Sequence, residues 1–128
     1  MAAKFKIEQN PTFEAKVGIH RAGGEKIEVG MIFKYRTRTE AAELSEKWRK
    51  RGEDLHKKYE GKEAGLPALV NAQIGLEVER ILDMIEAWEF EDVLSKESVR
   101  RLLNGGKAIH DAITKAYFDG LDPARLGN

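Results

Sequence analysis

The chain lacks several residue patterns on which common protein functions depend. It has no cysteine, which excludes disulfides, thiolate metal ligands and cysteine nucleophiles. No apolar run approaches the roughly 18 residues that a membrane-spanning helix requires, and no signal-peptide apolar segment opens the sequence. The net charge is zero, whereas nucleic-acid-binding domains are usually strongly basic. These absences favour a soluble, intracellular protein that binds neither membranes nor nucleic acid.

Motifs typical of catalysis are also missing. The histidines His20, His56 and His110 have no second histidine three or four positions away, so no metal-ligand pair shares a helical face. No serine lies in a G-x-S-x-G motif, and neither glycine pair belongs to a phosphate-binding loop. His110 and Asp111 are adjacent on an expected helix and therefore point in different directions. We expect no catalytic residue, no cofactor and no enzymatic activity.

Acidic residues provide the candidate for a cation site. Glu79 and Asp83, or Asp83 and Glu86, are spaced to share a helical face, and paired carboxylates suit an oxygen-ligated cation. Carboxylates are also common on the solvated side of an amphipathic helix, and no loop with calcium-ligand spacing accompanies these. We interpret them as a solvated face and expect no metal site.

The length of 128 residues fits one domain with a single modest core. We expect a single domain over residues 1–128, with a hairpin region at about 1–38 and a helical region at about 39–128. The charges are divided unevenly, because residues 1–62 hold 15 basic and 10 acidic side chains and residues 63–128 hold 7 and 12. This asymmetry suits head-to-tail association between copies, a charged partner, or simply two differently solvated faces.

Alternating apolar residues near the N-terminus predict a β-hairpin. Apolar positions recur at every second residue: Phe13, Ala15, Val17 and Ile19 in the first run, and Ile27, Val29, Met31, Phe33 and Tyr35 in the second. Gly23 and Gly24 between the runs suit a tight turn. Because an isolated hairpin is barely stable, its apolar face should pack on helices or on another copy. Residues 4–8 also alternate and predict either a short edge strand or a disordered start.

Thr37 and Glu40 match a capping box, which predicts a helix from about Glu40 to Lys58. The stretch Trp48-Arg49-Lys50-Arg51 suggests an alternative function, a small nucleic-acid-binding regulatory protein. The competing interpretation is a solvated helical face whose charges form i,i+4 ion pairs. We favour the solvated face.

The longest apolar segment predicts a central helix from about Pro67 to Trp88. Its apolar residues recur mostly at three- and four-residue steps: Leu69, Ile74, Val78, Ile81, Leu82 and Ile85. Leu66 and Leu76 widen this stripe, so we expect the helix to contact other elements on more than one side.

Two shorter helices are expected after the central one. Ser95 is placed as the N-cap of a helix that ends near Asn104. A last helix should run from about Lys107 to Phe118, with Gly120 at the position of a C-cap. The predicted fold class is therefore α+β, an N-terminal antiparallel β-hairpin packed on a bundle of about four helices.

Four aromatic residues near element ends are the candidate protein-binding residues: Trp88, Phe90, Tyr117 and Phe118. Aromatic side chains suit protein–protein contacts because they bring a large area with few rotatable bonds. Two of the four are expected to belong to the core, and the sequence does not separate them from the others.

Residues 78–128 carry features that together resemble a known family. They are a Trp-containing helix, a helix start at Leu94-Ser95, a helix end at Leu102-Leu103-Asn104, a last helix of the type Ala-Ile-x-x-Ala-Ile-x-x-Ala-Tyr, and the sequence Ala-Arg-Leu-Gly-Asn at the end. This region is similar to the tail assembly chaperones of long-tailed, siphovirus-type bacteriophages and prophages. No motif in that family is catalytic.

The resemblance implies a non-enzymatic assembly factor in the cytoplasm of the bacterial host, absent from the mature virion. Such a chaperone would coat the long helical tape-measure protein and recruit tail-tube protein subunits during tail morphogenesis. We also expect a homo-oligomer, because a two-sided apolar helix and halves of opposite charge provide self-association surfaces.

Overall fold

A computed structural model describes residues 3–126. Along this part of the chain the elements are β1 (Thr12–His20), β2 (Lys26–Lys34), α1 (Arg38–Tyr59), α2 (Leu66–Met84), β3 (Ile85–Trp88), α3 (Lys96–Leu103), α4 (Ala108–Leu121) and a short 3-10 turn at Pro123–Leu126. The strand order in the sheet is β1-β2-β3. The α+β prediction, with an N-terminal hairpin and four helices, is confirmed.

The hairpin forms as the alternation predicts. β1 and β2 are antiparallel, with Val17 opposite Val29. Gly23 and Gly24 have φ values of 88° and 97°, a left-handed conformation that glycine adopts without steric cost. One face of the sheet is therefore apolar and available to the helices.

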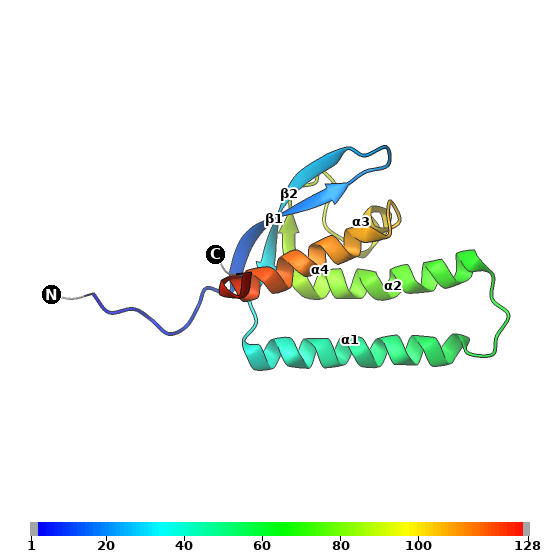
Figure 1. Ribbon diagram of the computed structural model, residues 1–128, viewed down its shortest axis with the longest axis horizontal. Coiled ribbons are helices and arrows are strands. Elements are labelled where there is room, and N and C mark those ends of the chain that lie inside the picture. The colour runs from blue at the N-terminus through cyan, green and yellow to red at the C-terminus, as the bar shows by residue number, and fades with distance from the viewer. Residues whose placement is uncertain (1–2, 127–128) are drawn as a thin grey trace.

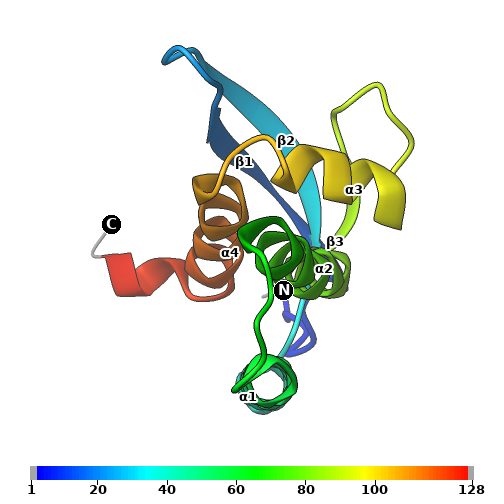
Figure 2. The same cartoon turned by 90° about the vertical axis from the view of Figure 1, so that its right-hand side faces the viewer.

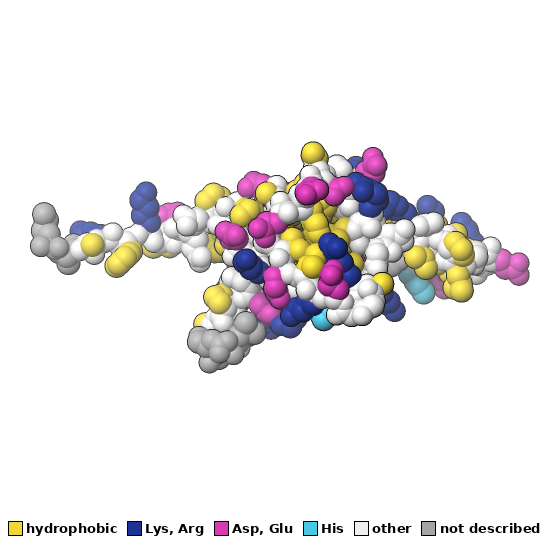
Figure 3. Space-filling model, turned by 90° about the horizontal axis from the view of Figure 1, so that it is seen from above, with side chains coloured by type: hydrophobic (Ala, Val, Ile, Leu, Met, Phe, Trp, Pro, Cys, Tyr) yellow, Lys and Arg dark blue, Asp and Glu magenta, His cyan; other side chains and the backbone are white. Residues whose placement is uncertain are grey.

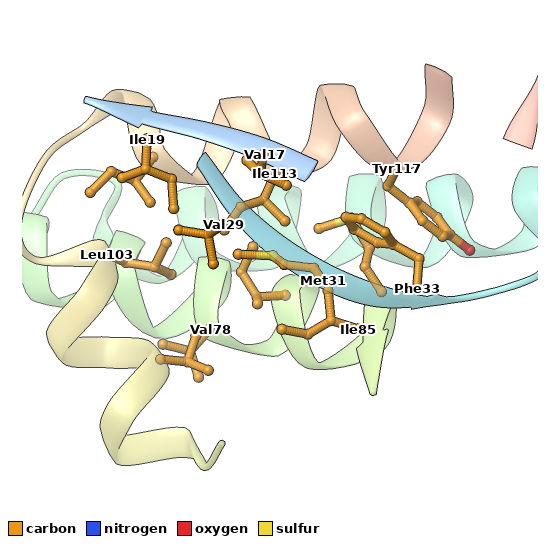
Figure 4. Packing of buried hydrophobic residues seen from close by; sticks show 14 of the residues in the cluster. Val17, Ile19, Val29, Met31, Phe33, Val78, Ile85, Leu103, Ile113 and Tyr117 are labelled. Carbon is orange, nitrogen blue, oxygen red and sulfur yellow. The ribbon is translucent and has the colours of Figure 1, made fainter. Parts of the chain in front are cut away.

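The helices lie in layers beneath this apolar face. Helices α2 and α4 contact the sheet, and α3 packs against α2. Helix α1 lies on the side of α2 that faces away from the sheet (Figure 2). The hydrophobic core therefore sits between the sheet and the pair α2 and α4 (Figure 4).

Three aromatic rings hold the C-terminal end of α4 to the hairpin. The rings of Phe13 and Phe33 lie 5.5 Å apart, and both contact the ring of Tyr117, at 6.0 and 5.5 Å. The ring of Phe13 also lies so close to Gly120 that a Cβ at this position would overlap it. Gly120 is thus an interior residue of α4, which continues to Leu121. The prediction of Gly120 as the C-cap was wrong, because close packing against Phe13 explains this glycine.

The third strand, β3, was not predicted. The central helix was expected to reach Trp88, but α2 ends at Met84 and the next four residues form a strand beside β2, with Met31 opposite Trp88 and an irregularity at Glu86. The pairing continues in Glu89, whose N–H donates to the carbonyl of Gly30 at 3.0 Å. Ile85 is buried in the strand, as it would have been in the helix, so burial alone does not distinguish the two conformations.

Helix α1 begins at a capping box, as predicted. The Thr37 hydroxyl accepts a hydrogen bond from the Glu40 N–H, and the Glu40 carboxylate accepts one from the Thr37 N–H, which lowers the pKa of Glu40. Leu44 and Trp48 are the buried residues of this helix. The Trp48 indole donates to an Asp83 carboxylate oxygen at 2.9 Å, which fixes α1 to the end of α2. Ser95 caps α3, also as predicted.

Residues 3–10 form no helix or strand. They extend away from the layers at one end of the molecule, whereas the turn between α1 and α2 lies at the opposite end (Figure 1). We call residues 3–10 the arm. The segment 4–8, which alternation marked as a possible edge strand, therefore pairs with no strand of this chain.

Candidate protein-binding surfaces

The four candidate aromatic residues fall into two groups. Trp88 and Phe90 lie together at the end of β3, with ring centroids 5.0 Å apart in an edge-to-face arrangement. Tyr117 and Phe118 lie together on α4, with ring centroids 5.2 Å apart. The fold does not bring the two groups into contact as one surface.

Trp88 and Phe90 line a shallow hollow of about 240 Å³ beside α3. Both side chains are half-buried. The Trp88 indole donates to the carbonyl oxygen of Asp92 at 2.8 Å, and Arg101 forms an ion pair with the Asp92 carboxylate. The hollow therefore combines aromatic area with a charged rim, which is the usual composition of a protein–protein contact.

Tyr117 is a core residue. Its side chain is fully buried, and its hydroxyl donates to the Lys34 carbonyl at 2.8 Å and accepts from Arg36 at 3.0 Å. Burial raises the pKa of Tyr117, and the hydrogen bond from Arg36 opposes that rise to a smaller extent. In this conformation Tyr117 offers no area to a partner, whereas Phe118 is half-buried against the edge of Trp48.

A groove between α1 and α2 was not anticipated from the sequence. It has a volume of about 470 Å³ and apolar walls made of Leu55, Tyr59, Leu69 and Ala72. The polar side chains His56, Glu60 and Gln73 also line it. We call it the α1–α2 groove. Its lining residues belong to the last turns of α1 and the first turns of α2, which extend beyond the sheet at the end of the molecule opposite the arm (Figure 1).

Large exposed apolar side chains are concentrated at two opposite ends of the molecule. Among residues 3–126 they are Phe5, Ile7, Leu66, Leu69, Val70 and Val93. Two belong to the arm and three to the first two turns of α2, which leaves Val93 apart from both ends. Figure 3 shows hydrophobic side chains on the arm and at the opposite end. The sequence had placed Leu69 in the core, since helical periodicity does not reveal whether a partner covers the stripe.

The basic stretch of α1 is largely neutralised. Trp48 is buried, Arg49 forms ion pairs with Glu46 and Glu53, and Arg51 pairs with Glu79 at 2.7 Å. Side chains paired in this way are poorly placed to meet phosphates, which bind proteins through free basic groups. This geometry does not favour the nucleic-acid alternative.

The described residues contain no group of three or more His, Cys, Asp or Glu side chains placed to hold a metal ion. Asp83, the central member of the candidate acidic cluster, is instead engaged with Lys47 and Trp48. Of the helices in residues 3–126, none has the length and apolar character required to cross a membrane.

Comparisons with known proteins identify the family of the chain. The family described as phage tail assembly chaperone matches residues 1–128. No match was found among curated proteins or among solved structures. The family match covers the hairpin and α1 as well as the C-terminal region on which the resemblance rested. The chain therefore belongs to the phage tail assembly chaperone family, whose members are non-enzymatic.

Proposed function

We propose that this chaperone binds the tape-measure protein in the α1–α2 groove and recruits tail-tube subunits to it. It acts in the cytoplasm of the bacterial host and is absent from the mature virion. Copies of the chain associate with one another while they coat the tape-measure protein. The observation that carries the proposal is the apolar groove left open between two helices of the same chain.

The groove suits a helical partner. Amphipathic helices commonly bind by laying an apolar face into a hydrophobic groove between helices. The walls here provide Leu55 and Tyr59 from α1 and Leu69 and Ala72 from α2. A long helical tape-measure protein would present an apolar stripe of this kind repeatedly along its length.

The polar surroundings of the groove suit a contact that must later be released. Glu60 and Gln73 line it, and α1 is densely charged on its exposed side. Interfaces between partners that separate are more polar at the rim than permanent interfaces. A chaperone that leaves before the tail is complete requires such reversible binding.

We assign recruitment of tail-tube protein to the hollow formed by Trp88 and Phe90. It lies beside α3, on the side of the molecule away from α1 (Figure 2). Binding to the groove and binding to the hollow would therefore not compete for the same surface.

Co-expression with the tape-measure protein tests the groove. The double variant Leu69→Glu/Ala72→Glu places two carboxylates in the apolar wall, where an incoming apolar stripe would have to desolvate them. We expect wild type to keep the tape-measure protein in solution and to co-purify with it, and the double variant to lose both effects. Val93→Glu is the matched control, because Val93 is exposed and lies outside the groove. Tape-measure protein that stays insoluble with wild type, or full activity of the double variant, would contradict the proposal.

A further inference from the structure

We propose that the arm of one copy binds in a groove between α2 and α4 of the next copy, so that the chains join head to tail. We call this second groove the α2–α4 groove, and it has a volume of about 510 Å³. Its apolar lining includes Val70, Ile74 and Leu103, and its charged lining includes Glu77, Lys107 and Asp111. The inference deepens the proposed self-association by naming both surfaces, and it is tested with the purified chaperone alone.

The arm has the composition of a binding segment. Phe5 and Ile7 are each 95% exposed, so the folded chain gains no burial from either. The free arm bends at Ile7 and Glu8. In an arm bound as extended backbone, alternate side chains would point to opposite sides, with Phe5 and Ile7 on one side and Lys4 and Lys6 on the other. Two large apolar side chains presented together can enter an apolar groove while the lysines remain at its edge.

The α2–α4 groove offers matching area. Val70 lines this groove and is 52% exposed. Ile74 and Leu103, which also line the groove, are buried, so Val70 supplies most of the apolar area that a partner chain can cover.

Charge complements the apolar match. Glu77 and Asp111 lie along the groove, with Lys107 as its basic member, and the arm carries Lys4 and Lys6 against a single acidic residue, Glu8. One carboxylate oxygen of Asp111 lies 3.0 Å from His110 Nδ1, but the side chain is 80% exposed, so an incoming lysine can still reach it. Complementary charges of this kind orient the approach of two chains and raise the association rate.

The positions of the two surfaces determine the kind of assembly. The arm leaves one end of the long axis and the first turns of α2 lie toward the other (Figure 1). An interface between two different surfaces of identical chains does not close on itself unless the rotation between copies completes a ring, and otherwise it builds an open filament. Repeated head-to-tail contact would produce a row of copies suited to covering a long partner.

A mixing experiment tests both surfaces. The arm variant Phe5→Ser/Ile7→Ser keeps its α2–α4 groove, and the groove variant Val70→Glu keeps its arm. We expect wild type to form oligomers that grow with concentration in light scattering coupled to size exclusion, and each variant alone to remain monomeric. An equimolar mixture should form dimers and nothing larger, because only one productive junction exists per pair. Each lost apolar contact should weaken association about tenfold or more.

Charge exchange and a control complete the test. Lys6→Glu should weaken association severalfold, and Glu77→Lys in the partner copy should restore it. Val93→Ser removes an exposed apolar side chain that belongs neither to the arm nor to the α2–α4 groove. This variant should oligomerise as wild type does. Wild type that stays monomeric at all concentrations would overturn the inference, as would an arm that packs on its own chain. If the groove variant oligomerised normally while the arm variant did not, the arm would bind elsewhere, and the assignment of the α2–α4 groove would be wrong.

Discussion

The buried hydroxyl of Tyr117 gives the sharpest prediction for stability. It donates to the Lys34 carbonyl and accepts from the Arg36 guanidinium, so it ties α4 to the end of β2. Tyr117→Phe removes this hydroxyl and keeps the ring that packs on Phe13 and Phe33. The change therefore isolates the hydrogen bonds from the aromatic packing.

The size of the expected loss of stability depends on the hydrogen bonds that the former partners of the Tyr117 hydroxyl keep. Arg36 keeps a hydrogen bond to the Asp83 carbonyl at 2.7 Å, so its charge is not left without a partner. A typical buried hydrogen bond contributes about 0.5–1.5 kcal/mol, and more where one group is charged. We expect Tyr117→Phe to lower the free energy of unfolding by about 1–2 kcal/mol, which corresponds to a fall of about 3–8 °C in Tm for a chain of this size.

The pH dependence provides a second readout. Burial raises the pKa of Tyr117 above its ordinary value of 10.0, so the folded chain holds this proton at a pH where the unfolded chain releases it. The contribution of the Tyr117 hydroxyl to the free energy of unfolding is therefore fully present below pH 10 and declines as the pH rises above that value. The difference in stability between wild type and Tyr117→Phe should therefore narrow above pH 10.

Urea or thermal unfolding followed by circular dichroism measures both effects. Tyr35→Phe is the matched control, since the Tyr35 hydroxyl accepts a solvent-exposed hydrogen bond from the Gln9 side-chain amide at 3.3 Å and its loss should cost less than about 0.5 kcal/mol. Equal stability of Tyr117→Phe and Tyr35→Phe at pH 7 would refute the reasoning. A difference between wild type and Tyr117→Phe that stayed constant from pH 8 to pH 11 would refute its electrostatic part.

Two further substitutions test the packing and capping of the helices. Gly120→Ala should destabilise the fold by about 1–2 kcal/mol, because the new Cβ overlaps the Phe13 ring and the strain exceeds the gain in helix propensity. Gly52→Ala is the control and should stabilise the fold by about 0.5–1 kcal/mol, since its Cβ would lie 3.7 Å from the Arg80 side chain, an ordinary van der Waals contact. If Gly120→Ala proved stabilising in the same unfolding assay, this account of Gly120 would be contradicted. Thr37→Ala should cost about 1 kcal/mol by removing the N-cap of α1, and an unchanged urea midpoint would show that the capping box contributes nothing.

The parts of the fold that depend on local chemistry could be predicted from the sequence. The glycine turn at 23–24, the Thr37 capping box and the Ser95 cap each involve groups within a few residues of one another. The alternation in the hairpin also identified its buried face, because the period of a strand fixes which side chains point inward.

Strand β3 could not be predicted in the same way. Ile81, Leu82 and Ile85 continue the spacing of the central helix, so the local pattern favours helix up to Trp88. The strand forms because β2 has an unpaired edge that this segment reaches across the fold. Such pairing joins residues more than fifty positions apart, and no window of neighbouring residues contains the information.

The candidate surfaces illustrate a related limit. Trp88 and Phe90 were singled out by residue type, and they do lie together. Tyr117 was singled out for the same reason and lies in the core, since an aromatic residue serves either purpose equally well. The α1–α2 groove was missed because Leu55 and Leu69 continue apolar stripes that are buried elsewhere on the same helices.

The distribution of exposed apolar area distinguishes between kinds of self-association. A closed dimer with a two-fold axis requires one self-complementary patch, and a monomeric protein usually shows its exposed apolar residues singly. This chain instead concentrates them on the arm and on the first turns of α2, which lie at opposite ends of its long axis (Figure 1). A two-fold dimer would have to bring both arms into both grooves at once, whereas a single head-to-tail contact leaves one arm and one groove unfilled. That imbalance is relieved only by adding further copies, and it gives a coating protein a physical reason to continue along its partner.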